Sequence, residues 1–122
     1  MKVFVYFNLH KKLFSVRALE GAHRGRVIAH RTQIRLEDVI FQVSQAGRER
    51  VLREQRKNVH AGVRGTWVPD PADGVAHAKT TLTALTYNPY KYSSFVNLDT
   101  QEPVHTARWA LLENRKIFAQ LA

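Results

Sequence analysis

The chain contains no cysteine, so disulfide bonds, thiolate nucleophiles and zinc sites built from cysteine are excluded. No apolar run approaches the roughly 20 residues that a membrane-spanning helix needs. The N-terminal segment is apolar but alternating, and it reaches His10, Lys11 and Lys12 too early for a signal peptide. These absences predict a cytoplasmic protein with no membrane partner.

Acidic residues are also few. Ten Asp and Glu stand against 19 Lys and Arg, which gives a formal net charge of +9. Such a charge attracts polyanions, whether nucleic acid, an anionic membrane surface or a small phosphorylated ligand, and composition does not separate these partners. The length of 122 residues predicts one domain, residues 1–122, near the size at which oligomerisation often adds stability.

Hydrophobic periodicity predicts an α+β fold, a small antiparallel β-sheet with two helices. One helix is expected mid-chain, from about Ser44, as its N-cap, to Asn58, and the other C-terminally, from about Thr106 to Leu121. A turn-rich connection is expected at Pro69–Lys79. The predicted strands and extended segments are Val3–Leu9, Leu13–Leu19, Arg26–His30, Val39–Val43, Val59–Val68, Thr80–Tyr87 and Tyr90–Leu98.

The residues that catalysis usually requires are scattered. Glu37-Asp38 is the only adjacent acidic pair, and neighbours in a strand point to opposite faces. No phosphate-binding loop or dinucleotide fingerprint occurs, and no two histidines have the i, i+4 spacing of a helical zinc site. Because phosphoryl chemistry usually needs a carboxylate-held metal or a positioned acid and base, we expect no enzyme, no metal site and no cofactor.

The mid-chain helix is strongly basic. Its period places Arg50, Arg53, Arg56 and Lys57 on one broad arc, while Val51 and Leu52 point toward a core. The alternative is a solvated face on which Glu49 pairs with Arg53 and Arg50 with Glu54. Ligand contact and solvated face are evenly supported.

The predicted C-terminal helix carries a second basic feature. Arg108 and Arg115 are seven residues apart, so in a helix they share a direction and stand roughly 10 Å from each other. They flank an apolar stripe, which suits a subunit interface that also frames a charged ligand.

The segment Gly21–Arg26 is a further candidate. Glycines at 21 and 25 allow backbone N–H groups to converge into an anion-binding nest, with charge added by His23, Arg24 and Arg26. A hairpin turn with solvated arginines is the favoured alternative.

Aromatic residues gather near position 90. Stacking on an aromatic face binds a nucleobase by about 1–3 kcal/mol, and an asparagine amide can read an adenine edge. The alternative is that some of these rings fill the core. The group consists of Tyr87, Tyr90, Tyr92 and Phe95, with Asn88 and Asn97 among them.

Four segments resemble a known family: MKVFVYFNLHKKLFSVRALEG, GRVIAH, VSQAGRERVLREQRKNVHAGVRGTW and YNPYKYSSFV. They are similar to the phage Thoeris anti-defence sponge family, type one, whose members sequester the cyclic ADP-ribose signal of bacterial TIR-domain enzymes. The resemblance implies a homo-oligomer of α+β protomers, with a dimer as its unit and a hexamer as its assembly. Glycocyclic ADP-ribose would sit in recesses between protomers, and a separate site would hold cyclic trinucleotides.

The resemblance also implies site residues. For the cyclic ADP-ribose recess they are Arg56, Phe95, Asn97, Arg108, Arg115 and Tyr87, and for the trinucleotide site His23, Arg24, Gly25 and Arg26.

We therefore expect a non-enzymatic phage protein of the host cell cytoplasm that binds cyclic nucleotide-type immune signals without cleaving them. It would block Thoeris effectors and, through trinucleotides, CBASS effectors. One rival is a small basic nucleic-acid-binding module, although nucleic acid is the less favoured partner, and a weaker rival is a phosphodiesterase.

Overall fold

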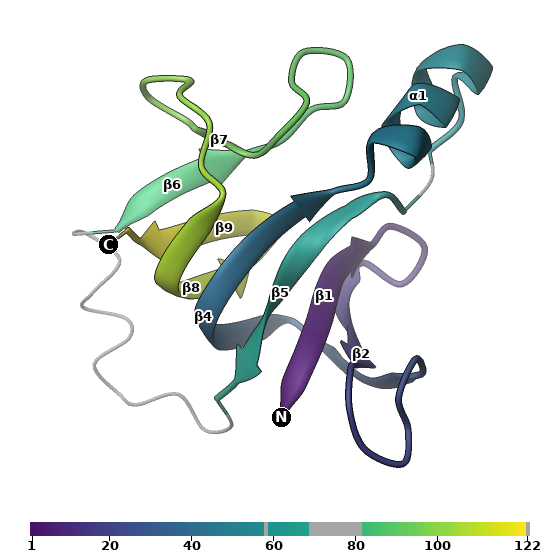
Figure 1. Cartoon of the computed structure of the whole chain (residues 1–122), viewed down its shortest axis with the longest axis vertical. Helices are drawn as coiled ribbons and strands as arrows, with labels where there is room; N and C mark the ends of the chain where they lie inside the picture. The colour runs from purple at the N-terminus through teal and green to yellow at the C-terminus, as the bar shows by residue number, and fades with distance from the viewer. Residues whose placement is uncertain (58, 69–81, 122) are drawn as a thin grey trace.

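The protein is described by a computed structural model over residues 1–57, 59–68 and 82–121. These residues form one nine-stranded, wholly antiparallel sheet in the order β3-β2-β1-β5-β4-β8-β9-β6-β7 and a single short helix (Figure 1). The prediction of antiparallel strands with helix is therefore correct in part, since the described fold is mostly sheet. The elements are β1 (Lys2–Asn8), β2 (Leu13–Ala18), β3 (Val27–Arg31), β4 (Gln33–Val43), α1 (Gln45–Glu54), β5 (Ala61–Trp67), β6 (Thr83–Thr86), β7 (Val96–Asn97), β8 (Thr106–Glu113) and β9 (Lys116–Gln120).

The sheet is strongly twisted (Figure 1), and one of its faces carries the core. Alternation along each strand sends Val3 and Val5 of β1 to this inner face, where Val16 and Val63 lie opposite Val5 on the two neighbouring strands. Phe4, between the two valines, points to the other, outer face. The buried cluster comprises Val3, Val5, Phe14, Val16, Ile34, Leu36, Val39, Phe41, Val63, Leu85, Phe95, Val104, Ala107, Ala110, Leu112 and Ala119.

Strand β4 lies between β5 and β8 and is longer than the predicted Val39–Val43. The pairing register with β5 shifts between Glu37 and Ile40, and Asp38 has a left-handed φ of 50°. The resulting bulge changes which residues face inward, from Leu36 before it to Val39 after it. Both halves of this long strand therefore contribute to the same core.

Helix α1 confirms the predicted mid-chain helix but ends earlier. The Ser44 side chain caps its start by accepting a hydrogen bond from the Gly47 N–H at 3.1 Å. Gln55 has a left-handed conformation and ends the helix at Glu54. Val51 is buried, as predicted. Arg56 lies beyond the helix, so it does not extend the basic arc.

The predicted C-terminal helix is wrong, because residues 106–120 form the β8–β9 hairpin. Its two-residue turn is Asn114-Arg115, with φ values of 50° and 67° at the two positions, the left-handed pair of a tight hairpin turn. The apolar residues of this segment are so closely spaced that they fit both the helical period of about 3.6 residues and the strand period of two. β8 pairs with β4 on one side and with β9 on the other, so its backbone hydrogen bonds are made between strands and the segment is a strand.

Most of the remaining strand predictions are confirmed. β1, β2, β3 and β5 lie where strands were expected, and the glycines of β5 make the close backbone approach that was expected of them. β6 and β7 are shorter than the segments predicted. The connection Pro69–Lys79 lies outside the described residues. Among the described residues no helix has the length and hydrophobicity to cross a membrane.

Candidate functional site

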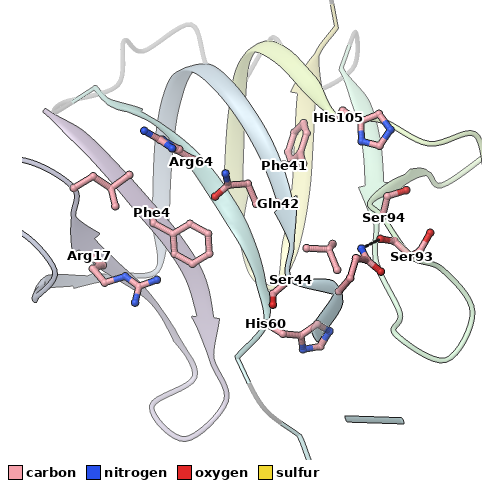
Figure 2. A pocket seen from close by; sticks show the side chains of 13 residues that line it. Phe4, Arg17, Phe41, Gln42, Ser44, His60, Arg64, Ser93, Ser94 and His105 are labelled. Atoms are coloured by element: carbon pink, nitrogen blue, oxygen red, sulfur yellow. Dashed lines mark hydrogen bonds between the residues drawn. The ribbon is translucent and has the colours of Figure 1, made fainter. Parts of the chain in front are cut away.

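A cavity lies where the sheet meets the start of helix α1. The cavity has a volume of about 580 Å³. Figure 2 shows side chains from β1, β2, β4 and β5 along one side of it and residues 93, 94 and 105 along the other. It is lined by Phe4, Arg17, Leu19, Phe41, Gln42, Val43, Ser44, Gln45, His60, Arg64, Ser93, Ser94 and His105.

The side of the cavity away from the sheet centre is fixed by side chains of α1. Gln45 Nε2 donates to the Ser93 carbonyl at 2.8 Å. Arg48 Nε lies 3.0 Å from the carbonyl oxygen of Pro89 and 2.8 Å from that of Tyr92, and donates to both. These contacts join the start of the helix to the loop that carries Ser93, so the two lining segments hold each other in place.

The charge of the cavity is of one sign. Arg17, Arg64, His60 and His105 line it, and none of the lining residues among those described is Asp or Glu. The first turn of α1 contains no acidic residue, and its N-terminal end at Ser44 adds the positive pole of the helix dipole. The cavity therefore has the electrostatics of an anion-binding site.

Aromatic rings support the cavity from behind. The Tyr87 ring stacks on Phe95 at 5.3 Å, and Phe95 packs at 5.4 Å against Phe41, which lines the cavity. The Tyr87 hydroxyl and His60 Nε2 share a hydrogen bond of 2.7 Å. Burial raises the pKa of Tyr87, and the nearby Arg48 guanidinium partly offsets this. The neutral phenol is therefore the form that the folded protein favours.

This pKa shift predicts a pH effect on stability. A raised folded-state pKa stabilises the protein fully below the unfolded value, about 10, and the contribution is lost as pH rises through the folded value. Tyr87→Phe removes both the titration and the hydrogen bond, so we expect it to cost about 1 kcal/mol near neutral pH. The difference in unfolding free energy between the two proteins should then shrink as pH rises above about 10. Urea denaturation of both proteins across this pH range measures it, and a constant difference would contradict the assignment.

Comparison with known proteins gives the family. The family model of the Mycobacterium phage L5 gene 82 protein matches residues 1–120. The chain belongs to this family. The gene 82 protein of Mycobacterium phage L5 is itself 41% identical over 110 residues, which cover 84% of this chain and 82% of the phage L5 protein. No solved structure matches.

Membership of this family places the chain among phage proteins. The descriptions of the family and of its phage L5 member identify a gene product by number and state no activity. The resemblance to Thoeris anti-defence sponges therefore stays a prediction.

Two of the residues predicted for the cyclic ADP-ribose site meet behind the cavity, and neither of them lines it. Tyr87 and Phe95 are in contact and form the layer behind its wall, and Phe95 is only 5% exposed. Phe95 is thus a core residue, the alternative that the sequence left open.

The other four are not brought together. Asn97 Oδ1 accepts hydrogen bonds from the Asp99 and Thr100 N–H groups and shapes the turn that follows β7. The Arg115 guanidinium lies 5.0 Å from the centre of the Phe7 ring, on the β8–β9 turn. Arg56 and Arg108 are exposed. None of these four residues lines the cavity.

The predicted trinucleotide segment forms an exposed hairpin loop between β2 and β3. Gly21 and Gly25 have positive φ values, as a nest requires. However, the N–H groups of Arg24, Gly25 and Arg26 donate to the carbonyls of Gly21, Ala18 and His23 within the hairpin. These three N–H groups are therefore not available to an anion.

Sequence reasoning missed the residues that line the sheet side of the cavity, namely Phe4, Arg17, Gln42 and Arg64. The available signal was alternation, because a residue between two inward-facing residues of a strand points outward. Which outward residues share a hollow depends on strand order, and that order joins β2 and β1 to β5, which is more than 40 residues away in sequence.

Among the residues that the structure describes, no group of three or more His, Asp or Glu side chains is placed to hold a metal ion.

Proposed function

We propose that this phage protein binds a cyclic, adenine-containing phosphate signal of the host, such as glycocyclic ADP-ribose, and sequesters it without cleaving it. One observation carries the proposal: a cavity of about 580 Å³ in which two arginines and two histidines lie beside aromatic, amide and hydroxyl groups, with no carboxylate among the described lining residues.

The lining chemistry fits the parts of such a ligand. Arginine forks bind pyrophosphate oxygens bidentately. The amides of Gln42 and Gln45 and the hydroxyls of Ser44 and Ser94 supply donors and acceptors for riboses and a base edge. Ligand pockets commonly measure roughly 300–1,000 Å³, and the cavity is within this range.

Sequestration works by stoichiometry, so the affinity must be high. A nanomolar dissociation constant corresponds to about 12 kcal/mol. Cleavage at phosphorus would need a metal held by carboxylates or a positioned acid and base. The cavity offers His60 and His105 as its titratable groups, and His60 is hydrogen-bonded to Tyr87. Phosphodiesterase activity is therefore the alternative, and an analysis of the products tests for it.

The proposal extends to assembly and location. The protein would act in the host cell cytoplasm as a homo-oligomer, with a dimer as the unit and a hexamer as the assembly, and a second copy would close the open side of the cavity. Removal of the signal would leave the Thoeris effector inactive, and binding of cyclic trinucleotides would do the same for CBASS.

The test is capture followed by release. Protein in excess is mixed with glycocyclic ADP-ribose, the small-molecule fraction is assayed, the protein is denatured by heat and the fraction is assayed again. We expect the ligand to disappear and then to return intact. Recovery of linear ADP-ribose would show hydrolysis, and a ligand that never leaves solution would refute the proposal. Native mass spectrometry of the same mixture gives the stoichiometry and the oligomer.

A steric variant locates the binding. Gln42 is exposed on β4 and lines the cavity, so Gln42→Trp should fill the cavity without changing charge and weaken capture by about tenfold or more. Gln33→Trp is the matched control, since Gln33 is exposed on the same strand and does not line the cavity. Equal affinities of the two variants, measured by calorimetry, would place the ligand elsewhere.

A nucleic-acid-binding module is the second candidate, and the exposed cations of α1 favour it. Arg50 and Arg53 are solvent-exposed on the helix, and Arg56 and Lys57 follow it, exposed as well. A gel shift of random duplex that weakens steeply with salt, without small-molecule binding, would select this function.

A further inference from the structure

Two cationic side chains flank an aromatic ring at the sheet side of the cavity. Arg17 lies opposite Phe4 in the β1–β2 register, and Arg64 lies opposite Phe4 in the β1–β5 register. Directly opposed residues on neighbouring strands point to the same face. The three side chains therefore form one cross-strand row on the outer face, and Figure 2 shows Phe4 between the two arginines.

The spacing of this row separates the two charges. Neighbouring strands are about 4.7–4.9 Å apart, so the Cα atoms of Arg17 and Arg64 are about 10 Å apart. The Arg17 Cζ atom lies 4.9 Å from the centre of the Phe4 ring, which holds this guanidinium by a cation–π contact. Phe4 thus lies on the strand between the two strands that carry the arginines.

The ring itself lies over a glycine. A Cβ atom at Gly62 would lie 2.4 Å from Phe4 Cζ, so the ring occupies space that any other residue at position 62 would fill. The contact of Arg17 with this ring places the guanidinium at the cavity before a ligand arrives, which lowers the entropic cost of binding.

Neither guanidinium forms an ion pair with a carboxylate of the described residues. Among the described residues the Arg64 guanidinium has no hydrogen bond or ion pair, and the side chain of Arg17 contacts the Phe4 ring. Two free forks that face a cavity without lining carboxylates will bind anionic oxygens.

We propose that Arg17, Phe4 and Arg64 form a diphosphate clamp, so that the cavity selects ligands with two linked phosphates over ligands with one. A single phosphate binds one fork well, but it does not reach the second fork while Arg17 stays on the ring. Two linked phosphates present oxygens to both. This inference rests on the proposed function for the biological ligand, but it concerns the chemical class alone.

The test compares adenine nucleotides that differ in one phosphate. Binding of ADP and AMP is measured by calorimetry at fixed ionic strength, with inorganic pyrophosphate and phosphate as probes without a base. We expect ADP to bind about tenfold or more tightly than AMP, and pyrophosphate to bind better than phosphate. Equal affinities within each pair would overturn the clamp.

Variants assign the preference to the two arginines. Arg17→Gln and Arg64→Gln should each bring the ADP to AMP affinity ratio close to one. Arg50→Gln is the matched control, since it makes the same charge change on an exposed helix residue outside the cavity, and it should leave the ratio unchanged. A ratio that survives both cavity variants, or that falls equally in the control, would refute the clamp. Circular dichroism confirms that each variant is folded.

The two proposals fail separately. Capture of intact glycocyclic ADP-ribose that is insensitive to Arg17→Gln and Arg64→Gln would remove the clamp and leave the sponge function standing. A preference for ADP that depends on both arginines, without capture of the cyclic signal, would support the clamp and refute the sponge function.

Discussion

Replacing Leu36 with alanine is expected to lower the free energy of unfolding by about 3 kcal/mol, within the range of about 2–5 kcal/mol for buried leucines. Leu36 is fully buried on β4, where it lies opposite Trp67 of β5 and Ala110 of β8. Truncation removes its contacts with the core and leaves a cavity, because the paired backbones on both sides prevent the strand from moving inward. Urea denaturation measures the change.

Ile40→Ala is the matched control for this prediction. Ile40 is an aliphatic residue of the same strand, but it lies beyond the bulge on the outer face and is 43% exposed. Its truncation should cost about 1 kcal/mol or less, since much of its surface already contacts water. If the two variants were equally destabilised, the assignment of inner and outer faces to β4 would be wrong.

Gly62→Ala is expected to destabilise the protein by about 2–3 kcal/mol, the cost of forcing extra volume into a packed site. The added Cβ atom would lie 2.4 Å from Phe4 Cζ and 2.6 Å from the carbonyl oxygen of Val5. The ring can move at some cost, but the backbone oxygen is fixed in the sheet between β1 and β5. The displaced ring would also release Arg17, so ADP binding should weaken together with stability.

A double variant separates the two clashes at Gly62. Phe4→Ala creates room for the new Cβ atom on the ring side and leaves the contact with the Val5 oxygen. Gly62→Ala should therefore cost less in the Phe4→Ala background than in the natural chain, with a coupling of about 1 kcal/mol. Additive costs would show that the ring does not rest on Gly62.

The elements that sequence predicted well are those with a strong local signal. Ser44 before a basic amphipathic run predicted the start of α1, and Val51 was correctly assigned to the buried stripe. The alternation in Val3–Leu9 predicted β1. The helix predicted from Thr106 to Leu121 is wrong because the apolar residues of this segment fit both the helical and the strand period. The prediction also placed the tight turn at Asn114-Arg115 inside the helix.

The candidate site was predictable only in character. The excess of basic residues and the need for aromatic partners were visible in the sequence. The sequence did not show which residues form the site, because Arg17 and Arg64 are brought to opposite sides of Phe4 by strand pairing over more than 40 residues. Arg108 and Arg115, expected on one helix face, instead lie on β8 and in the following turn.

By itself the sequence determined the charge of the chain, the absence of cysteine chemistry, and most strands together with the start of the helix, because these follow from composition, local periodicity and capping. The tertiary structure decided the strand order, the β8–β9 hairpin and the set of side chains around the cavity. Long-range backbone pairing sets these features, since hydrogen bonds between strands must be satisfied by partners that no local pattern specifies.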